Sequence, residues 1–104
     1  MSVSEMLEIL KLNLQITKNN NSNDELLIFL INQAKDLIKK EGIIDDGSND
    51  YSGAVIDYAA FLFRKRNSSE IKMPKHLRYE LNNILFSQKT RWLNGIRWWY
   101  FKSL

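Results

Sequence analysis

Residues 22–42 constrain the fold more than any other part of the chain. Apolar residues recur there at the three- and four-residue spacing of a helix, at Leu27, Leu30, Ile31, Ala34, Leu37 and Ile38. The six-residue apolar run 26–31 alone is also compatible with a buried strand, but the pattern continues to Ile38 and so favours a helix. The sequence therefore predicts a central helix over about 23–41 that is apolar on nearly all sides in its first half.

Both ends of this central helix have recognisable capping residues. Ser22 and Glu25 have the spacing of a capping box, in which the hydroxyl accepts a first-turn amide and the carboxylate accepts the cap amide. Lys39 and Lys40 lie in the last turn, where cations interact favourably with the helix dipole. Gly42 is suited to the left-handed conformation that follows a helix.

Three further segments have helical patterning, so we expect an all-α bundle of about four helices. They cover about residues 4–13, 51–66 and 74–92. Alternating apolar residues near the end of the first segment are also typical of a strand, but the chain has no second alternating run to pair with it. Ala59 and Ala60 allow close helix packing. The fourth segment has an apolar face at Leu77, Leu81, Ile84, Leu85 and Trp92.

Turn-forming residues set the other boundaries. Ser48 or Asp50 is expected to cap the third helix, and Pro74 suits the first turn of the fourth. Gly95 is expected to end the fourth helix, which divides the chain into a helical domain, 1–95, and an extended C-terminal tail. The Asp-rich loop before the third helix lacks the complete ligand spacing of a calcium loop, so no metal site is predicted.

Composition excludes several functional classes. A chain of 104 residues has room for one modest core, and without cysteine it has no disulfide, thiolate nucleophile or cysteine metal site. No apolar run approaches the length of a membrane span, and no signal peptide fits the acidic start, so we expect a protein made in the cytosol. No phosphate loop or acid–base constellation is visible, and the single His76 is expected at the surface. We predict no enzymatic activity and no cofactor.

Charge is divided unevenly along the chain. Residues 1–52 carry 5 Lys and Arg against 9 Asp and Glu, and residues 53–104 carry 10 against 3. The halves therefore have net charges of −4 and +7, in agreement with the total of +3. This asymmetry indicates a polyanionic partner, or copies of the chain that meet acidic face to basic face, although small domains also often have uneven surfaces.

A basic triplet ends the third helix and has two interpretations. It consists of Arg64, Lys65 and Arg66. Cations are favourable at a helix C-terminus, and the same residues are suited to a phosphate-facing patch. The fourth helix also has polar residues of the types that contact base edges, at Lys75, Arg78, Asn82 and Asn83. A small helical nucleic-acid-binding regulatory protein is therefore an alternative function.

The C-terminal tail, 96–104, is the second unusual feature. It contains four consecutive aromatic residues between two basic ones, in the order Arg97, Trp98, Trp99, Tyr100, Phe101 and Lys102. Chain termini usually fray, and an aromatic cluster left in water promotes association. Two interpretations stay open: the tail folds back to complete the core, or it anchors the chain to another protein, since Trp and Tyr are enriched in interface hot spots.

The burial of Phe29 indicates whether a single protomer can form a complete fold. The first half of the central helix has more apolar faces than short helices in so small a chain easily cover. A buried Phe29 favours a fold complete in itself, whereas an exposed Phe29 marks a subunit interface.

An ordered set of features resembles a known family. A short helix ends in Leu10-Lys11-x-x-Leu14-x-Ile16, and a polar turn leads to Asp24-Glu25-Leu26-Leu27 and then Ile31-x-x-Ala34-Lys35. A glycine-ended helix and an Ala- and Tyr-rich third helix follow. Over about residues 4–66 this order resembles the head–tail connector (head completion, or DNA-packaging adaptor) proteins of tailed bacteriophages.

The resemblance implies a structural virion protein, made in the bacterial cytoplasm and located in the neck between capsid and tail. Such proteins assemble as homo-oligomeric rings, typically dodecamers, under the portal protein. The ring extends the channel through which double-stranded DNA passes without sequence readout, and it gives the tail or a stopper protein a docking surface. In this family the C-terminal segment commonly grips the portal, a role that here falls on residues 97–101. The basic half then faces neighbouring subunits or lines the channel.

Overall fold

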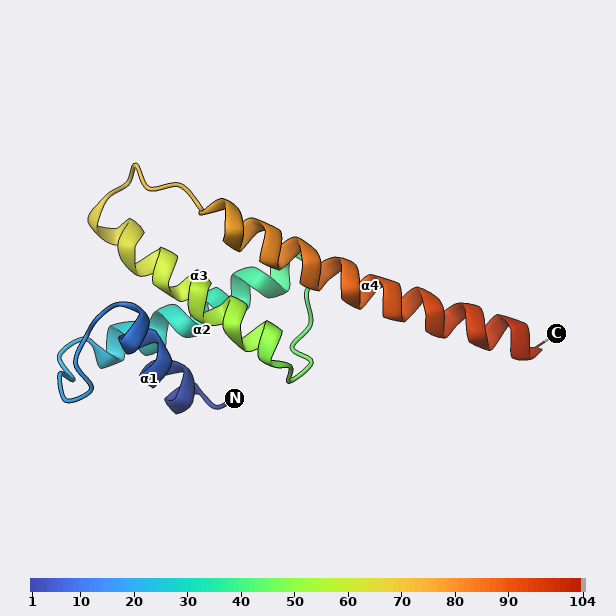
Figure 1. Cartoon of the computed structure of the whole chain (residues 1–104), viewed down its shortest axis with the longest axis horizontal. Coiled ribbons are helices and arrows are strands. Elements are labelled where there is room, and N and C mark those ends of the chain that lie inside the picture. Colours follow the sequence, from blue (N-terminus) through green and yellow to red (C-terminus); the bar gives the residue numbers. More distant parts are fainter. Residues whose placement is uncertain (104) are drawn as a thin grey trace.

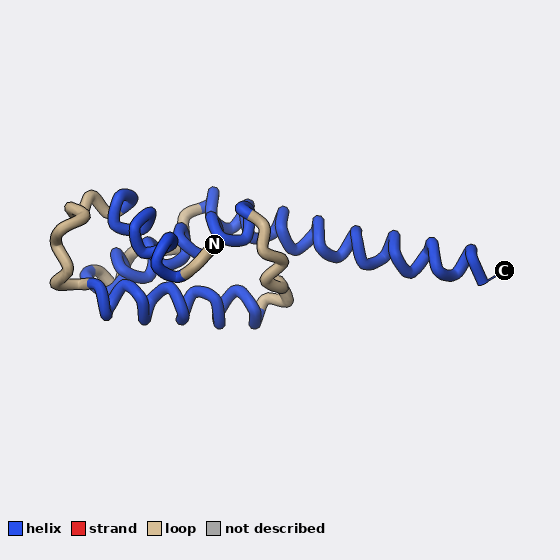
Figure 2. Tube along the Cα trace, turned by 90° about the horizontal axis from the view of Figure 1, so that it is seen from below, coloured by secondary structure: helices blue, strands red, loops and turns tan. Residues whose placement is uncertain are grey.

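The computed structural model describes the backbone of residues 1–103 and the side chains of residues 1–91. The described chain contains four helices and no strand: α1 (Val3–Asn13), α2 (Asp24–Lys40), α3 (Asn49–Asn67) and α4 (Lys75–Ser103). The all-α prediction and the starts of all four helices, to within two residues, are confirmed. Helices α1, α2 and α3 pack on one another, and α4 packs on α3 with its first half and then projects from this body (Figures 1 and 2).

The core lies between α2 and α3, with α1 and the first half of α4 closing it. Its fully buried large side chains are Met6, Leu10, Leu27, Ile31, Ile38, Ile43, Val55, Leu77 and Leu81. Ala54, Ala59 and Ala60 are also buried and let α3 approach α2 closely. The predicted apolar face of α4 is confirmed as far as Leu85, which packs against the core. Each fully buried Leu or Ile contributes about 1.5–3 kcal/mol through the hydrophobic effect.

The start of α3 is capped as the sequence predicts, the start of α1 is capped as well, and the predicted cap of α2 is absent. The Oγ of Ser2 accepts from the N–H of Glu5 at 3.2 Å, and the Oγ of Ser48 accepts from the N–H of Tyr51 at 3.1 Å. The expected cap of α2 at Ser22 is wrong. Asn23 occupies the cap position without a side-chain cap, and the Ser22 hydroxyl donates to Asn20 at 2.6 Å. Helix α2 therefore begins one residue later than a capping box at Ser22 requires.

The C-terminal end of α2 matches the prediction. Gly42 has a φ of 94°, in the left-handed region that favours glycine. Its N–H donates to the Lys39 carbonyl at 3.0 Å, and the N–H of Ile43 donates to the Ile38 carbonyl at 3.4 Å. These two bonds form a Schellman motif, and the Ile43 side chain is buried in the core.

The predicted end of α4 is wrong. Gly95 was expected to stop the helix and an extended tail to follow, but the backbone of α4 is helical through Gly95 to Ser103. Glycine inside a helix costs only about 1 kcal/mol relative to alanine, and no proline follows it to break the hydrogen-bond ladder. The side chains of Trp92 and of the predicted docking residues 97–101 lie outside the described part of the chain.

Among the described residues, no helix has the length and apolar character needed to cross a membrane. No group of three or more His, Asp and Glu side chains within residues 1–91 has an arrangement that would hold a metal ion.

Candidate subunit interfaces

Phe29 is exposed on the surface of α2, with 62% of its area accessible. It lies at a shallow groove of about 300 Å3 between α2 and the end of α3. The groove is lined by Phe29, Leu30, Gln33, Leu62, Lys65 and Arg66, which we call the Phe29 surface. The fold thus brings the aromatic residue and two members of the basic triplet, predicted separately as candidate sites, into one surface.

The basic triplet is exposed in the last turn of α3. Arg64 Nη2 donates to Asn13 Oδ1 at 3.2 Å, and Lys65 Nζ lies 5.7 Å from the centre of the Phe61 ring. None of the three ion pairs among the described side chains involves Arg64, Lys65 or Arg66. Lys65 and Arg66 therefore give the Phe29 surface a positive rim whose charges are not neutralised by carboxylates among the described side chains.

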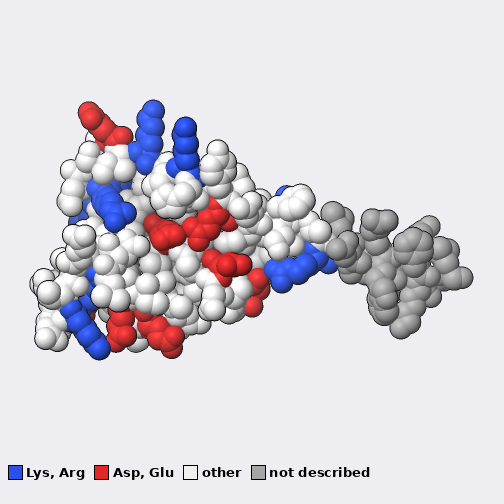
Figure 3. Space-filling model, viewed as in Figure 1, with Lys and Arg blue, Asp and Glu red and all other residues white. Residues whose placement is uncertain are grey.

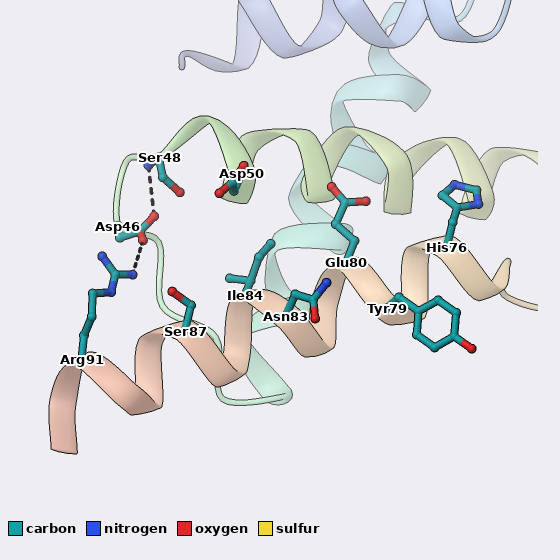
Figure 4. A pocket seen from close by; sticks show the side chains of 10 residues that line it. All are labelled: Asp46, Ser48, Asp50, His76, Tyr79, Glu80, Asn83, Ile84, Ser87 and Arg91. Carbon is teal, nitrogen blue, oxygen red and sulfur yellow. Dashed lines mark hydrogen bonds and ion pairs between the residues drawn. The ribbon is translucent and has the colours of Figure 1, made fainter. Parts of the chain in front are cut away.

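A larger cleft, of about 600 Å3, lies between α4 and the start of α3. Its lining residues, which we call the acidic cleft, are Asp46, Ser48, Asp50, His76, Tyr79, Glu80, Asn83, Ile84, Ser87 and Arg91. Figure 4 shows Asp50 on α3 and Glu80 on α4 directed into the gap between the two helices. In Figure 3 acidic side chains gather over this seam, and basic side chains lie toward the α3–α4 connection.

Asp46 closes one end of the acidic cleft. It accepts hydrogen bonds from the N–H of Ser48 and from Arg91 Nη2, both at 3.0 Å (Figure 4). Hydrogen bonding by Ser48, through its side chain and its backbone, and then by Arg91 holds the pKa of Asp46 well below its ordinary value. Asp46 is therefore a constant negative charge, and Arg91 balances it.

In the middle of the acidic cleft, no described cation forms an ion pair with the carboxyl groups. Burial raises the pKa of Glu80 to about 7, with further contributions from the adjacent Asp57 carboxyl and from Asp50. None of these three carboxyl groups belongs to an ion pair among the described side chains. A cation supplied from outside the protomer would relieve the repulsion among them.

The acidic cleft was not predicted as a site. The Asp-rich loop was noted, but as a cap and a rejected calcium site, and Glu80 lies 30 residues beyond Asp50 in the sequence. His76 is exposed at the rim, as expected. The side chains of the predicted portal-docking residues, 97–101, are not described, so the structure does not place them beside either surface.

Two surfaces of opposite charge are thus the clearest candidates for function on the described body. Each has an exposed aromatic residue beside its charges, Phe29 at 62% and Tyr79 at 64% accessibility. Comparison of the chain with protein-family models, curated proteins and solved structures finds no match.

Proposed function

We propose that this chain is a structural virion protein that forms a ring between the portal and the tail of a bacteriophage. The ring extends the DNA channel and provides a docking surface for the tail or a stopper protein. The ordered sequence features that resemble head–tail connector proteins support this proposal. The two oppositely charged surfaces of the body add to that support, since a ring subunit needs two different faces for its neighbours.

The observation that carries the proposal is the length of α4 relative to the body. Its 29 residues span about 43 Å at 1.5 Å per residue, and the molecule measures 60 × 29 × 18 Å. The second half of α4 therefore projects beyond α1–α3 (Figure 1). The last seven residues of the chain include four consecutive aromatics. A projecting helix of this composition is suited to a groove on another protein, which we propose is the portal.

Deletion of residues 96–104 tests the docking role. We expect the truncated chain to keep its helical body, because the side chains from Met6 to Ile84 already enclose a buried core between α1, α2, α3 and the first half of α4. It should lose binding to portal particles and incorporation into phage heads. Trp98→Ala/Trp99→Ala should weaken both, whereas Lys102→Ala, a change in the same segment, should have a smaller effect. Normal incorporation of the folded truncated chain would contradict the portal-docking proposal.

The alternative, a nucleic-acid-binding regulator, is favoured by the basic residues at the end of α3, which form no ion pair with the described side chains. The residues of α4 that were predicted to contact bases give this alternative less support. Arg78 forms an ion pair with Glu41, and Asn83 lines the acidic cleft, where carboxylates repel phosphate. Salt-dependent binding of duplex DNA that is lost in Arg64→Glu/Arg66→Glu would favour the regulator. Absence of binding at low salt would remove it.

A further inference from the structure

The Phe29 surface and the acidic cleft lie at opposite ends of α3. Asp50 is the second residue of α3, and Arg66 is the last but one. The difference of 16 positions between them corresponds to about 24 Å along the helix axis. Helix α3 is also the most deeply buried helix of the body, so it holds the two surfaces at a fixed separation.

We propose that the Phe29 surface of one copy docks against the acidic cleft of the next copy, so that the subunits associate head to tail. The inference rests on the proposed ring function and identifies the residues that form the contact between neighbouring subunits.

Charge complementarity identifies a second copy of the chain as the occupant. Lys65 and Arg66 are cations without an ion-pair partner among the described side chains, and Asp50 and Glu80 are carboxyl groups in the same situation. Contact between the surfaces brings these groups well within the roughly 10 Å over which charges interact at moderate salt. Since both surfaces belong to the same chain, each copy supplies what its neighbour lacks.

The aromatic residues are also complementary. Phe29 is exposed beside the cations, and Tyr79 is exposed at the cleft, where Ile84 forms part of the floor. Docking would remove both rings from water and would allow an arginine to lie over the Tyr79 ring. Aromatic residues near arginine are typical of the centre of protein interfaces.

The geometry also determines the kind of assembly. Unless the rotation between subunits is two-fold, a contact between two different surfaces leaves one free cleft and one free Phe29 surface on every pair, so association continues. It ends only when the rotation between subunits closes a ring. A head-to-tail contact is therefore consistent with a ring, and a two-fold rotation is the special case in which the same contacts close a dimer.

Two complementary variants test this contact directly. Asp50→Asn/Glu80→Gln removes charge from the acidic cleft and leaves the Phe29 surface intact, and Lys65→Glu/Arg66→Glu alters the Phe29 surface and leaves the cleft intact. Each variant alone should associate at least about tenfold more weakly than the wild type at low salt, as measured by sedimentation velocity. Mixed together they should form a 1:1 complex and nothing larger, because only one productive contact remains.

Two controls accompany the mixture. Lys39→Glu/Lys40→Glu makes the same charge change at a helix C-terminus outside both surfaces, and it should associate like the wild type. Circular dichroism should show that each variant is folded. For a cleft variant that unfolds, the milder Asp50→Asn takes its place, with the same expected 1:1 complex.

Each outcome decides the proposal. Wild-type association with no 1:1 complex in the mixture would overturn the head-to-tail contact and leave the ring function intact. A wild-type chain that stays monomeric at low salt up to about 1 mM would also overturn the contact. Portal binding by the truncated chain bears on the proposed function alone, so the two proposals fail separately.

Discussion

The side-chain amide of Gln88 in α4 pairs with both main-chain polar groups of Ile44. Its Nε2 donates to the Ile44 carbonyl at 2.7 Å, and its Oε1 accepts from the Ile44 N–H at 2.9 Å. One turn later, Arg91 donates to Asp46 at 3.0 Å. These polar contacts to the loop add to the apolar packing of Leu81, Ile84 and Leu85 in holding the middle of α4 against the body.

Replacement of Gln88 by alanine should loosen this attachment. Two partly exposed hydrogen bonds are lost, so we expect the free energy of unfolding to fall by about 1 kcal/mol. Urea denaturation measures this fall, and hydrogen exchange should show faster exchange of the Ile44 amide. Lys89→Ala, at an exposed neighbouring position, should leave both unchanged. Unaltered protection of Ile44 in Gln88→Ala would contradict this role of the glutamine.

Lys11 and Asp24 form the most buried ion pair among the described residues. The Lys11 side chain is 6% exposed, and its Nζ lies 2.6 Å from Asp24 Oδ1. It also donates to Asn21 Oδ1 at 3.2 Å, which ties α1 to the start of α2. Lys11→Met leaves the carboxylate without its cation, so we expect a loss of about 2 kcal/mol, below the range for fully buried pairs because Asp24 is partly exposed.

A double-mutant cycle separates the ion pair from packing. Lys11→Met/Asp24→Asn removes the unpaired charge as well and should regain part of the stability lost in Lys11→Met. Lys18→Met, on the exposed turn, is the matched control and should be close to neutral. Strictly additive effects of the two changes in thermal or urea unfolding would show that the pair contributes no interaction energy.

Gln15 and Gly42 occupy equivalent positions after two helices. Gln15 has a φ of 61°, and the N–H of Ile16 donates to the Lys11 carbonyl at 2.8 Å, as in the Schellman motif after α2. A side chain in the left-handed region costs about 1 kcal/mol. Gln15→Gly should therefore raise the free energy of unfolding by about 0.5–1 kcal/mol.

Gly42→Ala is the matched substitution, and it should lower the free energy of unfolding where Gln15→Gly raises it. A Cβ at Gly42 would lie 3.6 Å from Leu85 Cδ1, an ordinary contact, so the expected loss of about 1 kcal/mol comes from the backbone. Thermal unfolding of both variants measures the two effects. A loss of stability in Gln15→Gly would show that the glutamine side chain has a compensating contact.

Local patterns predicted the helices and most of the core. The spacing of Leu27, Ile31 and Ile38 identifies the buried face of α2, because helical periodicity depends only on the chain itself. The cap at Ser48 and the left-handed Gly42 were predicted for the same reason. The exposure of Phe29 could be posed as a question but not answered, since it depends on whether α1, α3 or α4 covers that side of α2.

The sequence did not predict features of the structure that depend on contacts between distant residues or on small differences in free energy. Ser22 has capping spacing, yet the start of α2 is set by the polar turn and by the pairing of Asp24 with Lys11. At Gly95 the preference against helix is only about 1 kcal/mol, which flanking residues outweigh. The acidic cleft combines the loop before α3 and the start of α3 with a helix that begins 25 residues after Asp50, and no local pattern reports such a contact.

Glu80 should make stability depend on pH in a direction opposite to that of most carboxylates. Its pKa is about 7 in the folded chain against an ordinary value of 4.5, so the folded state holds the proton more tightly. The resulting stabilisation is complete below about pH 4.5 and is lost as pH rises through 7. Above pH 7 the folded chain carries an ionised Glu80 beside Asp57 and Asp50, which is unfavourable.

The glutamine side chain in Glu80→Gln is uncharged at every pH, so this variant should not lose stability as the pH rises through 7. Because Glu80 is partly exposed, solvent screening reduces the effect, and we expect a gain of about 1 kcal/mol at pH 8. At pH 4 the variant and the wild type should unfold at the same urea concentration, since Glu80 is then protonated in both states. Glu70→Gln, an exposed carboxylate on the α3–α4 connection, should show no difference between the two pH values. An equal gain for Glu80→Gln at pH 4 and pH 8 would mean that packing, and not the ionisation of Glu80, causes it.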